Sequence, residues 1–238
     1  MKYVLDTHTH SIASGHAYST VNEMVAYAKE IGLSLLSITE HAPNMPGSCH
    51  SFYFHNFRVF KEHDFGIELL LGTELNILDF KGSVDMDEDT LSQMDIKIAS
   101  IHNPCMETGT AKENTAAYIG AMKNPFVDII GHPDDARIPI DYERLVEAAK
   151  KYKVALEFNN SSLNPKGFRK NALANDITYL TLCKEYGVPI TLGSDAHICY
   201  DIANFSYLYP VLEKINFPDS LILNTSTEKF KKHLCRNK

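Results

Sequence analysis

Short apolar runs recur along the chain, and most are followed by a segment in which apolar residues have helical spacing. The runs are rich in aliphatic and β-branched residues and have the length of strands. Several lack any alternation with polar residues, as expected for strands of a parallel sheet covered on both faces. The pattern predicts strands at residues 3–5, 33–39, 67–71, 96–101, 126–130, 154–158 and 188–192.

Helices are predicted between these strands. The segment from Thr20 to Glu23 has the sequence of a capping box, Asp141 has the position of a helix N-cap, and Gly187 that of a helix end. Helices are expected near 20–31, 87–94, 113–122, 141–152, 172–186, 202–214 and after 226, with a strand-like segment at 221–223. The less regular segment 42–64 is interpreted as a lid or binding loop.

Strands that alternate with helices in this way indicate βα units in a parallel sheet. Neither a polar linker nor a change of composition divides the chain, so residues 1–238 are predicted to form a single α/β domain. A barrel of seven βα units explains the pattern best, and an open doubly wound sheet is the alternative.

Composition and charge narrow the class of protein. Of 238 residues, 44% are hydrophobic, and the net charge is −7 without a basic stripe, which argues against a long nucleic acid partner. The five cysteines are odd in number and lack a C-x-x-C pair, which favours reduced thiols in a cytoplasmic protein. No apolar run approaches the roughly 20 residues of a membrane span, and the first strand leaves no room for a signal peptide.

Imidazole and carboxylate side chains follow six of the seven predicted strands. They are His8 and His10, His41, Glu74, His102, His132, and Asp195 with His197. A single histidine at a strand end is more often an ordinary polar residue, but the carboxyl ends of strands in a parallel barrel share one rim. The repeated placement therefore predicts a metal site there, and its mixed ligands suit Zn²⁺, Mn²⁺ or Fe²⁺ better than Ca²⁺.

The chain resembles a known family, the PHP (polymerase and histidinol phosphatase) metallohydrolases, over nearly its whole length. The resemblance rests on short motifs in a fixed order: His8-Thr9-His10, His16-Ala17-Tyr18-Ser19-Thr20, Thr39-Glu40-His41, Gly72-Thr73-Glu74, His102, His132-Pro133 and Gly193-Ser194-Asp195-Ala196-His197. Within the family, the chain is most similar to the stand-alone YcdX-type phosphatases. This resemblance implies a distorted (β/α)7 TIM-like barrel.

The resemblance also implies three divalent metal ions, with Zn²⁺ the first choice and Mn²⁺ or Fe²⁺ the alternatives. The first ion would be held by His8, His10, Glu74 and Asp195, the second by His16, His41 and His197, and the third by Glu74, His102 and His132. The ions would supply more positive charge than the two carboxylates cancel, which favours an anionic substrate.

The predicted activity is hydrolysis of small-molecule phosphomonoesters by attack of a metal-bound hydroxide. Glu74, Asp195 and His197 are the expected catalytic residues. Arg58, Asn160 and Ser161 are the expected substrate-binding residues, and Lys166 and Arg169 are weaker candidates. The general acid, the preference between monoesters, diesters and nucleotides, and the oligomeric state stay open.

Two alternatives remain at this point. An amidohydrolase-type enzyme also begins with a His-x-His pair, but that family usually has a bridging lysine after a middle strand. A non-catalytic, metal-stabilised PHP module that binds a partner is the second alternative, although such modules often lose ligands that this chain retains.

Overall fold

The computed structural model describes residues 3–234 of the chain. Its strands form one seven-stranded sheet, parallel throughout, in the order of the sequence. The strands are β1 (Leu5–Asp6), β2 (Leu35–His41), β3 (Glu68–Asn76), β4 (Ile96–Ser100), β5 (Ile129–Ile130), β6 (Ala155–Asn159) and β7 (Ile190–Gly193). This strand order confirms the predicted seven-stranded α/β barrel and excludes a doubly wound sheet, in which the order would reverse.

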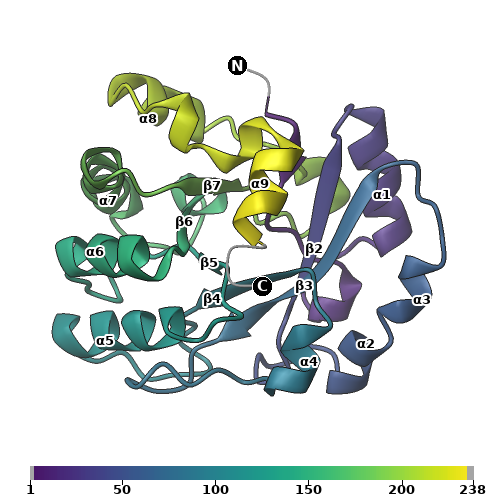
Figure 1. Ribbon diagram of the computed structural model, residues 1–238, viewed down its shortest axis with the longest axis horizontal. Helices are drawn as coiled ribbons and strands as arrows, with labels where there is room; N and C mark the ends of the chain where they lie inside the picture. Colours follow the sequence, from purple (N-terminus) through teal and green to yellow (C-terminus); the bar gives the residue numbers. More distant parts are fainter. Residues whose placement is uncertain (1–2, 235–238) are drawn as a thin grey trace.

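Helices surround the sheet, as Figure 1 shows for α5, α6 and α7 on one side and α1 on the other. The α-helices are α1 (Val21–Glu30), α2 (Ser51–His55), α3 (Arg58–Lys61), α4 (Glu88–Ser92), α5 (Ala111–Met122), α6 (Tyr142–Tyr152), α7 (Ala172–Tyr186), α8 (Leu208–Lys214) and α9 (Thr227–Leu234). Short 3₁₀ helices are η1 (Ile12–Ser14), η2 (Ser161–Leu163), η3 (Cys199–Asp201), η4 (Asp219–Leu221) and η5 (Leu223–Thr225). Within residues 3–234, no helix combines the length and apolar character that crossing a membrane requires.

Two of the predicted helix starts are confirmed by their caps. The Thr20 side chain accepts a hydrogen bond from the backbone of Glu23, and the Glu23 carboxylate accepts one from the backbone of Thr20. Asp141 caps α6 by accepting from the backbone of Arg144. These bonds satisfy N–H groups that the helix itself leaves unpaired.

Two segments differ from their predicted form. The helix expected over 202–214 is reduced to α8, because Ala203 adopts a positive φ of 53° and its N–H donates to the Asp6 carboxylate instead of entering a helix. The segment predicted as strand-like at 221–223 makes one isolated bridge, between Ile222 and Ile190. The irregular segment 42–64 contains two short helices, α2 and α3.

The barrel closes between β1 and β7 with the help of one buried side chain. The Asn224 amide oxygen accepts from Leu192 N at 2.7 Å, and its amide nitrogen donates to Leu5 O at 3.1 Å and Leu192 O at 2.8 Å. Its backbone oxygen also accepts from Val4 N. Asn224 therefore replaces part of the ladder of hydrogen bonds that two adjacent strands would otherwise form.

Replacing Asn224 with alanine is expected to lower the free energy of unfolding by about 2–4 kcal/mol, because three buried backbone groups lose side-chain partners. Urea denaturation followed by circular dichroism measures this. The matched control is Asn22→Ala on the exposed face of α1, with an expected change within about 0.5 kcal/mol. Equal stability of the two variants would show that Asn224 does not hold the barrel closed.

The N-terminal end of the barrel is filled by apolar side chains and covered by α9. Leu5, Leu35 and Ile96 from the starts of their strands pack in one cluster with Phe230 and Leu234 of α9. Figure 1 shows α9 lying across the strands at this end. Because one end of the barrel is sealed, a cavity for a ligand can open at the C-terminal end of the strands, where the polar motifs lie.

Candidate metal centre

The residues predicted as metal ligands come together at the C-terminal ends of the strands. His41 and Glu74 are direct partners in the register of β2 and β3. A parallel bridge between Thr9 and Ala196 places the segment that carries His8 and His10 beside the one that carries Asp195 and His197. The predicted strand 67–71 is longer in the structure, so Glu74 lies inside β3 instead of following it.

Glu74 is the centre of the cluster. One carboxylate oxygen lies 2.9 Å from His41 Nδ1, 3.3 Å from His8 Nε2 and 3.5 Å from His10 Nε2. The other oxygen lies 2.8 Å from His132 Nε2 and 3.1 Å from His102 Nε2. A single buried carboxylate therefore faces imidazoles from two sides, which is the arrangement of a bridging ligand.

Asp195 and two further histidines complete the cluster. One oxygen of Asp195 lies 3.4 Å from His10 Nε2 and 3.8 Å from His8 Nε2. The ring of His16 lies 5.0 Å from that of His41 and 4.8 Å from that of His197, measured between centroids. All nine predicted ligands thus belong to one connected group.

Three subsets of this group have ligand atoms within 4.8 Å of one another: His8 with His10 and Glu74, His10 with His41 and His197, and His41 with Glu74 and His102. The first lies within the predicted set of the first ion, whereas the other two cross the predicted sets. The structure therefore gathers the residues, while their assignment to individual ions stays a prediction.

Hydrogen bonds at Nδ1 fix the orientation of four imidazoles. Their Nδ1 atoms lie within hydrogen-bond distance of an oxygen: His8 of Glu157 (2.7 Å), His10 of Ser14 (3.0 Å), His102 of Asn76 (2.7 Å) and His197 of the Asp195 backbone (2.9 Å). A proton on Nδ1 of each ring would satisfy these oxygens and leave the lone pair of Nε2 facing the cluster. In that neutral tautomer a histidine can bind a metal ion through Nε2.

The pKa shifts of the cluster residues also agree with a role as metal ligands. Burial acts to raise the pKa of Glu74, but His102, His8 and His41 outweigh it and hold this pKa well below its usual range. Burial also opposes ionisation of Asp195, yet His8, His10 and Arg169 keep its pKa well below normal. Burial and the neighbouring His41 and His197 lower the pKa of His10, which keeps this ring neutral.

His8 shows where positive charge is favoured. Burial lowers its pKa, but the carboxylates of Glu157, Glu74 and Asp195 outweigh this and raise the pKa well above normal. In addition, His41 Nδ1 and one Glu74 oxygen are buried without a hydrogen bond, although they lie 2.9 Å apart. A divalent cation would satisfy both atoms and replace the proton on His8, so the residues present fit a metal ion.

Two residues of the cluster have a strained backbone. His132 has φ of 26° and Asp195 has φ of 57°, values that L-residues rarely adopt. The Asp195 N–H donates to His8 O, and His132 N–H donates to the Glu157 carboxylate, so the strained residues are held by other parts of the site. Strain of this kind is typical of positions selected for the direction of a side chain.

A cavity of about 640 Å³ opens over the cluster. Of the predicted substrate-binding residues, Ser161 lines it. Arg58 is exposed at the start of α3 and lines a separate surface pocket, and Asn160 is buried with its amide oxygen bound to the backbone of Tyr207. The weaker candidate Arg169 lines the cavity, whereas Lys166 is exposed and is not among its lining residues.

Arg169 is fixed beside the cluster. Its guanidinium donates to Ser162 Oγ at 3.0 Å, and both terminal nitrogens lie 3.4 Å from the second oxygen of Asp195. The Asn159 amide donates to the same Asp195 oxygen at 3.3 Å. The structure therefore places Arg169, and not Arg58, where a guanidinium can reach an anion bound at the cluster.

Sequence reasoning missed the residues that orient the ligands. Glu157 is an acidic residue inside an otherwise apolar strand, and Asn159 follows it on the same face of β6. Asn76 likewise follows Glu74 by two positions in β3. In both strands, polar residues alternate with apolar ones although the strand is buried. This alternation was the signal in the sequence that polar side chains point into the barrel.

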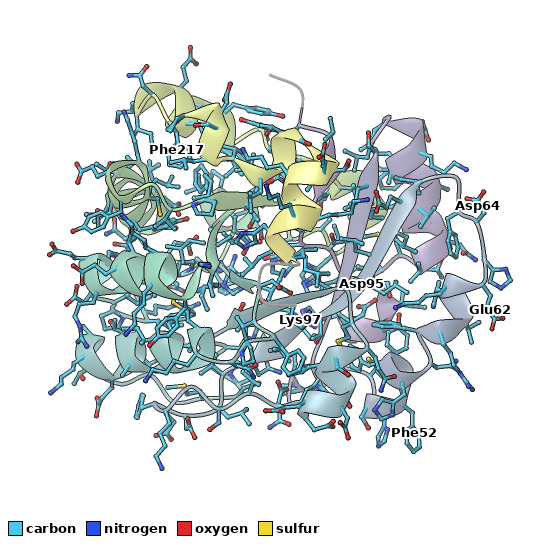
Figure 2. The ribbon with its side chains drawn as sticks, in the orientation of Figure 1. Phe52, Glu62, Asp64, Asp95, Lys97 and Phe217 are labelled. Carbon is cyan, nitrogen blue, oxygen red and sulfur yellow. The ribbon has the colours of Figure 1, made fainter. Side chains whose placement is uncertain are left out.

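The barrel also contains a buried lysine, Lys97, but it lies away from the cluster. Lys97 is the second residue of β4, and its Nζ lies 3.2 Å from the Asp128 carboxylate. Figure 2 labels Lys97 among the strands, near α9. No lysine is among the described residues that line the cavity, so the bridging lysine typical of the amidohydrolase alternative has no counterpart there.

Comparisons with known proteins agree with this geometry. A family model described as the PHP domain matches residues 6–164. A protein named probable phosphatase from Clostridium novyi (strain NT) is 47% identical over 98% of this chain and 95% of its own length. Another of the same name, from Caldanaerobacter subterraneus subsp. tengcongensis, is 47% identical over 98% of this chain and 92% of its own length.

Among solved structures, the fold is similar to that of histidinol phosphate phosphatase from Lactococcus lactis subsp. lactis Il1403, described as complexed with zinc, L-histidinol and phosphate. The TM-score is 0.63 and the sequence identity is 20%, with 91% of this chain and 95% of that chain covered. This likeness shows the fold, a distorted (β/α)7 barrel of the same type.

Proposed function

The chain belongs to the PHP domain family, and from this premise we propose that it is a metal-dependent phosphatase that hydrolyses small-molecule phosphomonoesters. The observation that carries the proposal is Glu74, a single buried carboxylate that faces His8, His10 and His41 with one oxygen and His102 and His132 with the other. The near-full-length relatives named probable phosphatases support the same activity.

We assign the ligands as the sequence predicted them. His8, His10, Glu74 and Asp195 would hold one ion, His16, His41 and His197 a second, and Glu74, His102 and His132 a third. Zn²⁺ is the first choice, with Mn²⁺ and Fe²⁺ as alternatives, because imidazole and carboxylate together suit these ions. Bound ions would supply positive charge to the phosphoryl oxygens and lower the pKa of water toward neutrality.

The protein's own residues then bind and orient the ester. Arg169 would donate to a phosphoryl oxygen, since its guanidinium already lies beside an anionic oxygen of Asp195. The other oxygen of Asp195 faces the cluster and can take a proton there. His197 and Ser161, both partly exposed at the cavity wall, would contact the substrate from the open side.

The cavity favours a small ester over a long chain of nucleotides. Its volume of about 640 Å³ is in the range of sites for small molecules. The net charge of −7 also disfavours the counterion release that drives binding of long nucleic acids.

The test is a screen of phosphomonoesters, phosphodiesters and amides with the purified protein loaded in turn with Zn²⁺, Mn²⁺ or Fe²⁺. Turnover of monoesters in preference to the other two classes is expected. Hydrolysis of amides alone would favour the amidohydrolase alternative. Bound metal without hydrolysis of any class would favour a module that binds a partner.

A further inference from the structure

Beyond Arg169, the outer wall of the cavity contains several apolar side chains. Met45, Ile101, Pro104, Ile138 and Phe168 line it together with the polar cluster. Met45, Ile101 and Ile138 are buried, while Phe168 is 66% exposed. Of the exposed large hydrophobic side chains within residues 3–234, Phe168 is the one that lines this cavity.

The exposed ring of Phe168 is held in place by two arginines. The guanidinium carbon of Arg137 lies 5.1 Å from the ring centroid, and that of Arg169 lies 5.4 Å from it. Asp135 fixes Arg137 through both Nε and Nη2 and accepts from the backbone of Lys170. An aromatic side chain that is exposed and yet oriented in this way offers a fixed apolar surface for contact with a ligand.

Each arginine of the outer wall is paired with a carboxylate. Arg137 is paired with Asp135, Arg169 is paired with Asp195, and Asp201 adds a further negative charge to the lining. Among the described lining residues, these two arginines are the cations other than histidine. A second anionic group on the substrate would therefore meet no unpaired positive charge outside the cluster.

From this arrangement we infer that Phe168 selects the leaving group of the substrate. The preferred substrate is a phosphomonoester whose leaving group is uncharged and presents a flat apolar ring to Phe168. The inference rests on the proposed function. Arg169 would contact the phosphoryl group, and the neighbouring Phe168 would contact the ring. Two adjacent residues would therefore bind the phosphoryl group and the leaving group of the same substrate.

The test compares benzyl phosphate with ethyl phosphate, because both have alkoxide leaving groups and differ in the ring. For the wild-type protein loaded with Zn²⁺ or Mn²⁺, kcat/KM is expected to be about tenfold higher for benzyl phosphate. In Phe168→Ala this preference should fall to about twofold or less. The readout is the ratio of the two kcat/KM values, because the substitution also removes a contact of Arg169 and can change both values together. A bisphosphate of similar size should be hydrolysed no faster than ethyl phosphate.

A binding measurement gives a second readout without turnover. Titration calorimetry should show benzylphosphonate binding about tenfold more tightly than ethylphosphonate, and Phe168→Ala should remove the difference. Phe52→Ala is the matched control, since Phe52 of α2 is 72% exposed (Figure 2) and lines a separate surface pocket instead of this cavity. This control should keep the wild-type preference.

The outcomes separate the two proposals. Equal use and equal binding of the benzyl and ethyl compounds by the wild type, or a preference that survives in Phe168→Ala, would overturn the inference while leaving the phosphatase activity intact. Absence of any turnover and of any phosphonate binding with every metal would instead contradict the proposed function.

Discussion

Replacing Glu74 with glutamine is expected to lower kcat/KM for phosphomonoesters by about 10³-fold or more, because one carboxylate faces five imidazoles and serves two of the proposed ions. Glutamine keeps the size and one oxygen but removes the negative charge. The side-chain amide would also bring N–H donors to Nε2 atoms whose proposed role is to bind metal. The loss should therefore be accompanied by a lower metal content, and not by a change of KM alone.

The measurement combines steady-state kinetics with metal analysis of the same preparation. Glu62→Gln is the matched control, since Glu62 is exposed at the end of α3 (Figure 2). Circular dichroism and the thermal midpoint establish that each variant is folded. A folded Glu74→Gln variant with wild-type activity and metal content would contradict the bridging role.

Replacing Arg169 with alanine is expected to lower kcat/KM by about 10²-fold, mainly through a higher KM and weaker inhibition by inorganic phosphate. The guanidinium lies 3.4 Å from Asp195 and 3.0 Å from Ser162 Oγ, so it is fixed before substrate arrives. Arg169→Lys should recover part of the loss, because lysine restores the charge without the bidentate geometry. Metal content should stay close to that of wild type, which distinguishes this variant from Glu74→Gln.

Parallel measurements on Arg58→Ala decide between the two arginines. The sequence resemblance pointed to Arg58, whereas the structure places that residue in another pocket. Arg144→Ala, on the exposed face of α6, controls for the loss of a positive charge. A large loss in Arg58→Ala with none in Arg169→Ala would contradict the placement of the phosphate-binding group.

The barrel and most of the polar cluster were predictable from sequence because both follow from simple periodicity, whereas His16 lies in a loop and was predicted from the family resemblance alone. Apolar runs of strand length marked the strands, and His41, His102 and His132 stood at or just beyond their ends. In a parallel barrel these ends share one rim, so residues far apart in the sequence converge. The strand boundaries were less accurate, as the extension of β3 to Asn76 shows.

The residues around the cluster were harder to predict because their roles depend on tertiary contacts. Nothing local distinguishes Ser14 from other serines of its loop, yet it contacts His10 Nδ1 and donates to Glu40. Arg169 follows a loop after β6, and its reach to Asp195 depends on how that loop packs. The same holds for Asn224, whose sequence neighbours give no sign that it joins two strands.

Metal analysis of the purified wild-type protein tests the central claim most directly, that the rim of the barrel holds a cluster of divalent ions. After dialysis against metal-free buffer, mass spectrometry is expected to find about three transition-metal ions per chain, with loss of both metal and activity after treatment with a strong chelator and recovery on adding Zn²⁺ or Mn²⁺. Full phosphatase activity in protein that contains well under about one such ion per chain would contradict the account.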